Sequence, residues 1–110
     1  MVQGIGAALF EECHYSEYGQ LQNATMADYL VPMSGEMPDI VCGHVESKTR
    51  TSELGAKGVG EAGTAGAPGA VMNAINDALV PFGARVTSMP FTPERVLDAL
   101  EAGKTQAVPR

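Results

Sequence analysis

The sequence predicts an α+β fold with about three helices and three or four short strands. In the second half of the chain, apolar residues recur at helical spacing. These residues are Val71, Ala74, Ile75, Ala78 and Leu79. Elsewhere, short apolar stretches alternate with polar residues between glycines and prolines, as strands do. At 110 residues the chain has room for one modest core, so we expect a single domain over residues 1–110.

The first predicted helix covers residues 3–13, QGIGAALFEEC, where apolar residues are spaced by helical turns. Its two glycines, Gly4 and Gly6, would let another backbone pack closely against it. Residues 14–23, HYSEYGQLQN, are then predicted to form a strand, a turn at Gly19 and a returning strand.

An irregular segment separates these elements from the next predicted strand. Residues 27–40, ADYLVPMSGEMPDI, are interrupted by two prolines and a glycine, so we expect an extended or irregular conformation there. Residues 40–47, IVCGHVES, alternate well enough for a strand. One face of that strand would carry Ile40, Cys42 and His44, and the other Val41 and Val45.

The clearest predicted helix covers residues 67–80, with Pro68 near its start, where proline is tolerated. Pro81 and Gly83 are expected to end it, because neither continues a helix readily. A short strand is predicted next, at residues 84–92, ARVTSMPFT.

The last predicted helix covers residues 92–103, TPERVLDALEAG. Thr92 is the expected N-cap and Pro93 the first helical residue, since a hydroxyl can accept a hydrogen bond from the first turn. Gly103 is the expected C-cap. Residues 104–110 are expected to form a frayed tail.

Composition and charge exclude several classes of function. The net charge of −6 leaves no basic stripe for a nucleic acid. The first residues, MVQGIGAALFEEC, lack a basic region, and no apolar stretch reaches the roughly 20 residues of a membrane span. We therefore expect a cytoplasmic protein without a membrane span, in which Cys13 and Cys42 are free thiols.

A glycine-rich stretch at residues 55–63, GAKGVGEAG, is the main candidate for chemistry. Gly58, Gly60 and Gly63 match the dinucleotide fingerprint. That fingerprint requires an apolar strand directly before the glycines, and the residues here are polar, so a dinucleotide-binding fold is not predicted. Successive glycine amides ahead of a helix can still receive an anionic group, and Lys57 would add positive charge.

Glu61, inside this loop, has two interpretations. It is either a carboxylate favoured by the dipole at a helix start, or a working acid or base. The candidate ligands for a zinc site are Cys13, His14, Cys42 and His44. Their spacing argues against zinc, because the first two are adjacent and diverge and the last two are separated by a single residue.

Five blocks of the sequence resemble one enzyme family, in the same order and at the same intervals. The blocks are QGIGAALFEE, GQLQNATMADYLVP, GAKGVGEAG, GAPGAVMNAINDAL and TPERVLDAL. They are similar to the C-terminal part of the large, molybdopterin-binding subunit of the xanthine oxidase family of molybdenum hydroxylases. The branch they resemble most is that of the carbon monoxide dehydrogenase large chain and aldehyde oxidase-like proteins. The resemblance covers essentially the whole chain and implies a piece of the molybdenum-cofactor-binding domain.

The resemblance implies that Glu61 is the catalytic base beside molybdenum. Contacts to a molybdopterin cytosine dinucleotide are implied for Lys57, Gly58, Val59, Gly60, Gln3 and Gly4. No residue of this chain is implied as a metal ligand. The implied reaction is hydroxylation of an aldehyde, an N-heterocycle or carbon monoxide with oxygen from water. Iron–sulfur clusters and FAD on partner subunits would carry the electrons away.

The large subunit of this family is several times longer than the chain. We therefore expect the chain to be a C-terminal portion that acts with the remainder of the subunit on a small-molecule substrate. One loop cannot hold a pterin dinucleotide, so the isolated chain is expected to be inactive. Two alternatives stay open: a non-catalytic fragment or assembly domain that keeps only the fold, and a small nucleotide-binding module built on the glycines of residues 58–63.

Overall fold

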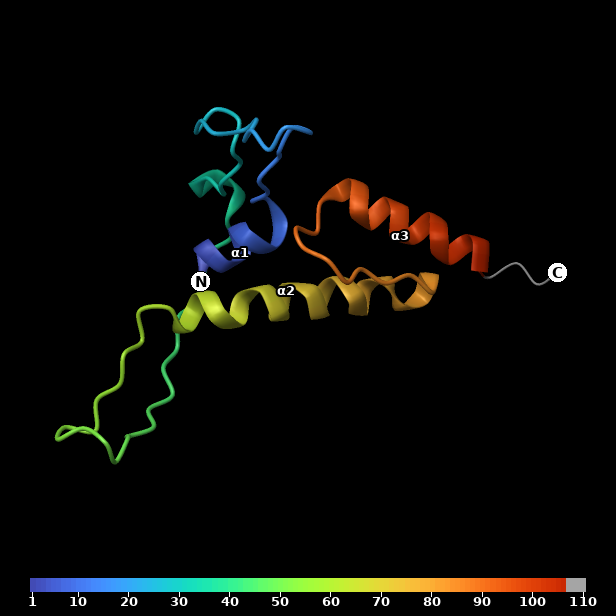
Figure 1. Cartoon of the computed structure of the whole chain (residues 1–110). Helices are drawn as coiled ribbons and strands as arrows, with labels where there is room; N and C mark the ends of the chain where they lie inside the picture. Colours follow the sequence, from blue (N-terminus) through green and yellow to red (C-terminus); the bar gives the residue numbers. More distant parts are fainter. Residues whose placement is uncertain (107–110) are drawn as a thin grey trace.

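The computed structural model describes residues 1–106, in which helices are linked by long irregular segments (Figure 1). The helices are α1 (Val2–Leu9), the 3-10 turn η1 (Ser34–Glu36), α2 (Ala62–Leu79), the 3-10 turn η2 (Val80–Phe82) and α3 (Pro93–Gln106). The prediction of about three helices is therefore confirmed.

The prediction of three or four strands is wrong. Within residues 1–106 the only strand-like pairing is an isolated antiparallel bridge between Tyr15 and Leu21, with a turn at Gly19, whose φ is 77°. Residues 40–47 and 84–92 have the alternating pattern of strands, but neither forms a ladder with another segment of the described chain. A strand needs a partner, and the pattern of one segment cannot supply it.

Two asparagine side chains hold loops in place where strand pairing was predicted. The amide of Asn23, a residue that is only 9 % exposed, accepts a hydrogen bond from the His14 N–H (2.9 Å). It also donates one to the Glu12 carbonyl (2.7 Å). The Asn76 amide likewise donates to the Val86 carbonyl and accepts from the Val86 N–H, both at 2.9 Å. Each amide thus satisfies backbone groups that a neighbouring strand would otherwise satisfy.

Helix α1 ends at Leu9, before the predicted end at residue 13. Glu11 and Glu12 follow it closely, and negative charge is unfavourable at a helix C-terminus. Both carboxylates are used in tertiary contacts instead. Tyr29 donates a hydrogen bond of 2.9 Å to Glu11, which raises the pKa of Tyr29 above its usual value. Glu12 forms an ion pair with Arg95, near the start of α3.

Helix α2 begins at Ala62, before the predicted start at residue 67, so Pro68 lies inside the helix. Residues 62–67 are small and include three alanines, which favour helix. The end of this helical region is confirmed near its predicted position. The chain passes through η2 and then reverses at Gly83, which has φ 62° and ψ 20° and so adopts the left-handed conformation that glycine allows.

Helix α3 begins as predicted, with Pro93 as its first residue and a hydrogen bond of 3.4 Å from the Arg95 N–H to the Thr92 hydroxyl. The assignment of Gly103 as C-cap is wrong, because this residue lies inside the helix. A Cβ built on Gly103 would lie 2.9 Å from the Phe82 carbonyl oxygen. The glycine therefore permits close packing of α3 on η2 and does not end the helix.

The expected tail at residues 104–110 is only partly covered by the described residues. Residues 104–106 belong to α3, and residues 107–110 lie outside the described part of the chain.

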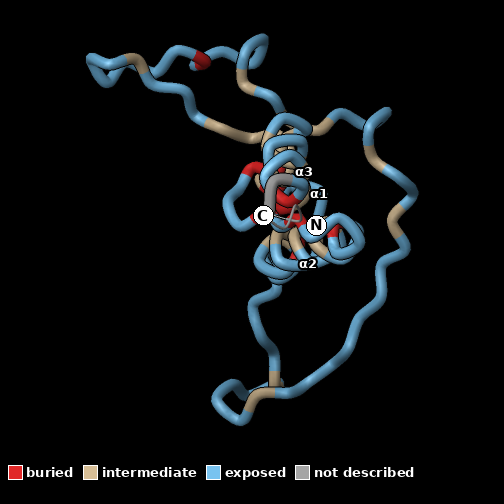
Figure 2. The backbone as a smooth tube through the Cα atoms, turned by 90° about the vertical axis from the view of Figure 1, so that its right-hand side faces the viewer, coloured by how far each residue is buried: buried red, intermediate tan, exposed pale blue. Residues whose placement is uncertain are grey.

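The core is small and lies where the end of α1, the second half of α2 and α3 meet (Figure 2). Its buried residues are Ala8, Leu79, Ala84, Val86 and Phe91. The Phe91 N–H donates a hydrogen bond of 2.7 Å to the Ala8 carbonyl, which ties the segment before α3 to α1. In the described residues, no large side chain is fully buried.

The chain is far more open than a compact domain of its length. Its radius of gyration is 18.6 Å, whereas a compact chain of 110 residues is expected near roughly 13 Å. The segment between η1 and α2 projects from the helices as a long excursion (Figure 1). None of the helices in residues 1–106 combines the length and the apolar character needed to cross a membrane.

We predict that Asn76→Ala destabilises the chain by about 1 to 3 kcal/mol, because the half-buried N–H and carbonyl of Val86 both lose their partner. Urea unfolding followed by circular dichroism measures the change. Asn73→Ala is the matched control, since Asn73 is an exposed asparagine on the same helix. Equal stability of the two variants would show that the amide bridge contributes nothing.

Candidate functional site

The N-terminal ends of α1 and α2 lie side by side (Figure 1). A Cβ built on Gly63 would lie 3.0 Å from the Met1 nitrogen, and one built on Gly4 would lie 3.1 Å from the Thr64 Cα. The first turn of each helix is therefore in contact with the first turn of the other. We call this place, residues 1–4 and 61–64, the helix-start junction.

The close approach depends on the absence of a side chain at Gly4. Its Cβ would lie 2.7 Å from the Thr64 carbonyl oxygen and 2.8 Å from the Ala67 Cβ, both closer than real contacts allow. The Thr64 carbonyl is also unusual, because the residue four positions later is Pro68, which has no N–H to donate. That carbonyl faces the Gly4 backbone instead of completing a helical hydrogen bond.

The junction provides a favourable place for negative charge. The N-terminal end of a helix carries a partial positive charge from its unpaired N–H groups. Neither α1 nor α2 has an acidic residue in its first turn, and neither has a side-chain hydrogen bond at its N-cap. Two helix dipoles therefore point their positive ends at the same region without a first-turn carboxylate to offset them.

Glu61 occupies the N-cap position of α2, and its side chain is exposed. Its backbone carbonyl accepts hydrogen bonds from the N–H groups of Thr64 (3.0 Å) and Ala65 (2.9 Å), as expected at a helix start. Its carboxylate caps nothing, and no hydrogen bond or ion pair joins it to any other described residue. Both carboxylate oxygens of Glu61 are thus without a partner among the described residues.

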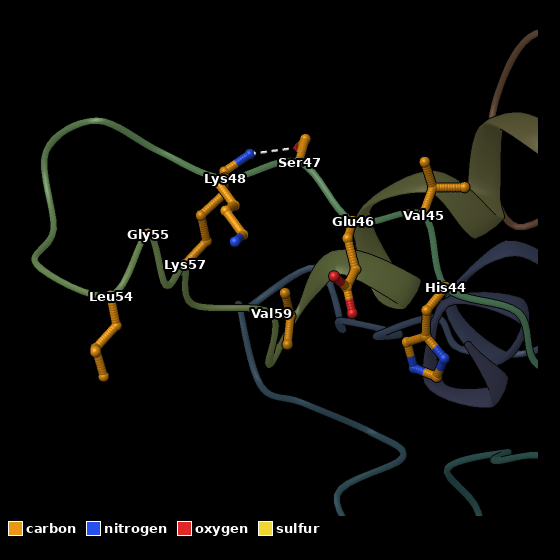
Figure 3. Close-up of a pocket in the computed structure, with 9 residues that line it drawn as sticks. All are labelled: His44, Val45, Glu46, Ser47, Lys48, Leu54, Gly55, Lys57 and Val59. Atoms are coloured by element: carbon orange, nitrogen blue, oxygen red, sulfur yellow. Dashed lines mark hydrogen bonds between the residues drawn. The ribbon is translucent and has the colours of Figure 1, made fainter.

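The four residues before Glu61, Lys57 to Gly60, are all exposed. Gly58 and Gly60 face open space, since a Cβ built on either one would meet no atom within 4 Å. The Lys57 ammonium donates a hydrogen bond of 2.6 Å to the Ser47 hydroxyl across the loop (Figure 3). The contact between Lys57 and Ser47 was not predicted, because it joins residues ten positions apart in the chain.

A groove of about 410 Å³ lies between the two limbs of this excursion (Figure 3). Its lining residues are His44, Val45, Glu46, Ser47, Lys48, Leu54, Gly55, Lys57 and Val59. The groove is open to solvent on a segment that stands away from the helices, so it is a feature of the excursion and not of the helix-start junction.

The predicted site residues fall into three places. Gln3 is exposed at the start of α1, and Gly4, the next residue, is buried against α2. Glu61 is the N-cap of α2, two residues before Gly63, whose backbone lies close to Met1. Lys57 is turned toward Ser47. In residues 1–106 no three side chains of histidine, cysteine, aspartate or glutamate come together in a way that could hold a metal ion, and Cys13 and Cys42 are both free and exposed.

The chain matches known molybdenum-containing proteins in sequence. A family model for the molybdopterin cofactor-binding domain matches residues 1–38. The nicotine 6-hydroxylase large subunit of Paenarthrobacter nicotinovorans is 42 % identical over 99 residues, which are 90 % of this chain and 12 % of that protein. The aldehyde oxidoreductase molybdenum-binding subunit PaoC of Escherichia coli K12 is 37 % identical over 91 % of this chain and 14 % of its own length.

Solved structures match the shape of the chain as well. Quinoline 2-oxidoreductase from Pseudomonas putida 86 is 39 % identical and has a TM-score of 0.84 over 91 % of this chain and 13 % of that chain. Carbon monoxide dehydrogenase from Oligotropha carboxidovorans is 26 % identical and has a TM-score of 0.83 over 96 % of this chain and 13 % of that one. The chain therefore spans about one eighth of the length of these proteins.

We predict that Gly4→Ala destabilises the chain by about 1 to 3 kcal/mol, because its methyl group forces α1 away from the Thr64 carbonyl. The control is Gly66→Ala on α2, where a Cβ meets nothing within 4 Å; it should stabilise the helix by about 0.5 to 1 kcal/mol. Urea unfolding measures both changes. Full tolerance of alanine at Gly4 would contradict the close helix contact.

Proposed function

Because this chain belongs to the xanthine oxidase family of molybdenum hydroxylases, we propose that it forms one wall of a molybdopterin site and supplies the catalytic base. The observation that carries the proposal is the unpaired Glu61 carboxylate at the helix-start junction, directly after an exposed glycine-rich backbone. The carboxylate that we propose as the base therefore directly follows the backbone that we propose as the contact for an anionic cofactor group.

The residues present fit a phosphate-bearing cofactor. The open space at Gly58 and Gly60 lets a ligand reach the backbone N–H groups of the loop, which side chains at these positions would obstruct. The positive ends of α1 and α2 favour an anion at the junction. We propose that the loop from Lys57 to Gly60, together with Gln3, contacts a molybdopterin cytosine dinucleotide, and that Gly4 acts by bringing α1 close to α2.

When bound, the cofactor supplies a metal that accepts electrons from the substrate. The contribution of this chain is a proton acceptor: a Glu61 carboxylate oxygen takes the proton released as oxygen from water is added to the substrate carbon. The position of the residue at a helix start fixes its backbone, and the absence of a capping hydrogen bond leaves both carboxylate oxygens available. The proposed substrates are an aldehyde, an N-heterocycle or carbon monoxide.

The remaining parts of the enzyme must come from elsewhere. The chain spans only 10 to 14 % of the length of the curated relatives that it matches, and residues 57–60 of its glycine loop are exposed. We propose that it acts with the remainder of a molybdenum-binding subunit and with partner subunits that carry iron–sulfur clusters and FAD, in the cytoplasm, and that it is inactive alone. The same short span also favours a second candidate, an assembly domain that keeps the fold without the chemistry.

We predict that Glu61→Gln lowers turnover of the assembled enzyme by at least about a hundredfold, because the amide cannot accept the proton. Molybdenum content, measured by elemental mass spectrometry, should stay unchanged. Glu53→Gln is the matched control, since Glu53 is an exposed glutamate in the same excursion and away from the junction.

Normal turnover of the Glu61→Gln enzyme would show that Glu61 is not the base. An assembled, unsubstituted complex that contains no molybdenum would support the assembly domain instead.

A further inference from the structure

Residues 38–48 form an extended segment without any backbone pairing. No helix or turn interrupts them, and Met37, just before them, has φ −96° and ψ 135°, which are strand-like values. Within residues 1–106 no backbone–backbone hydrogen bond involves this segment. Both of its edges therefore present free N–H and carbonyl groups over most of its length.

The sequence of the segment is that of a strand. Ile40 and Cys42 alternate with Val41 and the small Gly43, and β-branched residues are favoured in sheets. Val41 is 94 % exposed and Val45 is 99 % exposed. A segment with strand-forming residues, free backbone edges and exposed valines has every feature of a strand except its partner.

We infer that residues 38–48 add as a strand to the edge of a sheet in the remainder of the molybdenum-binding subunit. Such pairing would satisfy the free backbone groups of the segment and cover its valines. The inference rests on the proposed function, since it requires that this chain work together with the rest of such a subunit.

The comparisons favour this partner over a second copy of the chain. Quinoline 2-oxidoreductase superposes with a TM-score of 0.84 and covers 91 % of this chain, so about a tenth of the chain is unmatched. The excursion, residues 37–61, is longer than that unmatched part. Part of the excursion is therefore matched in quinoline 2-oxidoreductase, of which the whole match covers only 13 %. A segment that stands away from its own helices thus has a counterpart in a much longer polypeptide, which could supply a neighbouring strand.

Pairing of the first limb would also position the second. Lys57 bonds to Ser47, and the Thr49 N–H donates to the Gly55 carbonyl at 3.2 Å, so the two limbs are joined near the tip of the excursion. The second limb leads directly to Glu61. Docking of residues 38–48 would thus restrict the loop that carries the proposed base.

Hydrogen exchange read by mass spectrometry tests the inference on the chain alone and on the assembled subunit, with and without cofactor. In the isolated chain, residues 39–48 should exchange like an unstructured peptide. In the assembled subunit, roughly half of these amides should slow by at least about a hundredfold, because one edge of the strand is paired. The slowing should not depend on the cofactor.

Fast exchange in the assembled subunit, or slowing that requires the cofactor, would overturn the inference. Slowing in the isolated chain would assign the pairing to a second copy and would overturn it too. The measurement does not depend on turnover, so it stays interpretable even if Glu61→Gln proves fully active.

Proline substitutions provide a second test, with this chain and the remaining polypeptide co-expressed as separate chains. Val45→Pro and His44→Pro remove neighbouring N–H groups that point to opposite edges of a strand. At least one should lower the assembled fraction by about tenfold, while Val45→Thr, which keeps the N–H and the branched shape, should not. Circular dichroism checks that the helices, which do not contain these residues, still fold. Full assembly of both proline variants would contradict the pairing.

Discussion

The arrangement of this chain depends on the contact between α1 and α2 at Gly4. No other residue type fits there, because a Cβ would lie 2.7 Å from the Thr64 carbonyl and 2.8 Å from the Ala67 Cβ. The contact sets the position of both helix starts, and with them the position of Glu61. The proline at position 68 contributes from the other side, since it leaves the Thr64 carbonyl without its usual helical donor.

Hydrogen bonds and an ion pair of polar side chains connect segments that a larger core or a sheet would otherwise hold together. Asn76 holds the segment before α3 against α2, and Asn23 holds the loop after α1. Arg95 binds both the Glu12 carboxylate and the Pro90 carbonyl, and so connects the start of α3 to the end of α1. These bridges fix the helices around a core of few and mostly small residues.

The open shape and the proposed role have a common physical basis. A chain that leaves Val41, Val45 and Leu54 at least 86 % exposed has not buried all of the apolar surface that its sequence offers. In a molybdenum-binding subunit this surface would lie against the remaining polypeptide. The same exposure leaves the glycine loop accessible to a ligand, as the proposed role requires.

The existence of three helices could be predicted from local sequence patterns, although several of their ends could not. Helical periodicity, Thr92 as cap and the stop at Gly83 follow from contacts within a few residues. The predicted start of α2 at residue 67 was too late, and the structure makes Glu61 the N-cap of this helix. The close approach of another backbone was predictable at Gly4, because only glycine lacks a Cβ. At Gly6 the close neighbours are the side chains of Glu11 and Pro32.

Only the tertiary structure decided which segments meet. The alternating pattern of residues 40–47 predicts a strand, but a ladder requires a second strand that the described chain does not place beside it. Glycine is common at helix ends, but Gly103 lies inside α3, where the absence of a side chain allows close packing on the Phe82 carbonyl. The adjacency of Gly4 and Thr64 likewise joins residues far apart in the chain, and no local pattern carries that information.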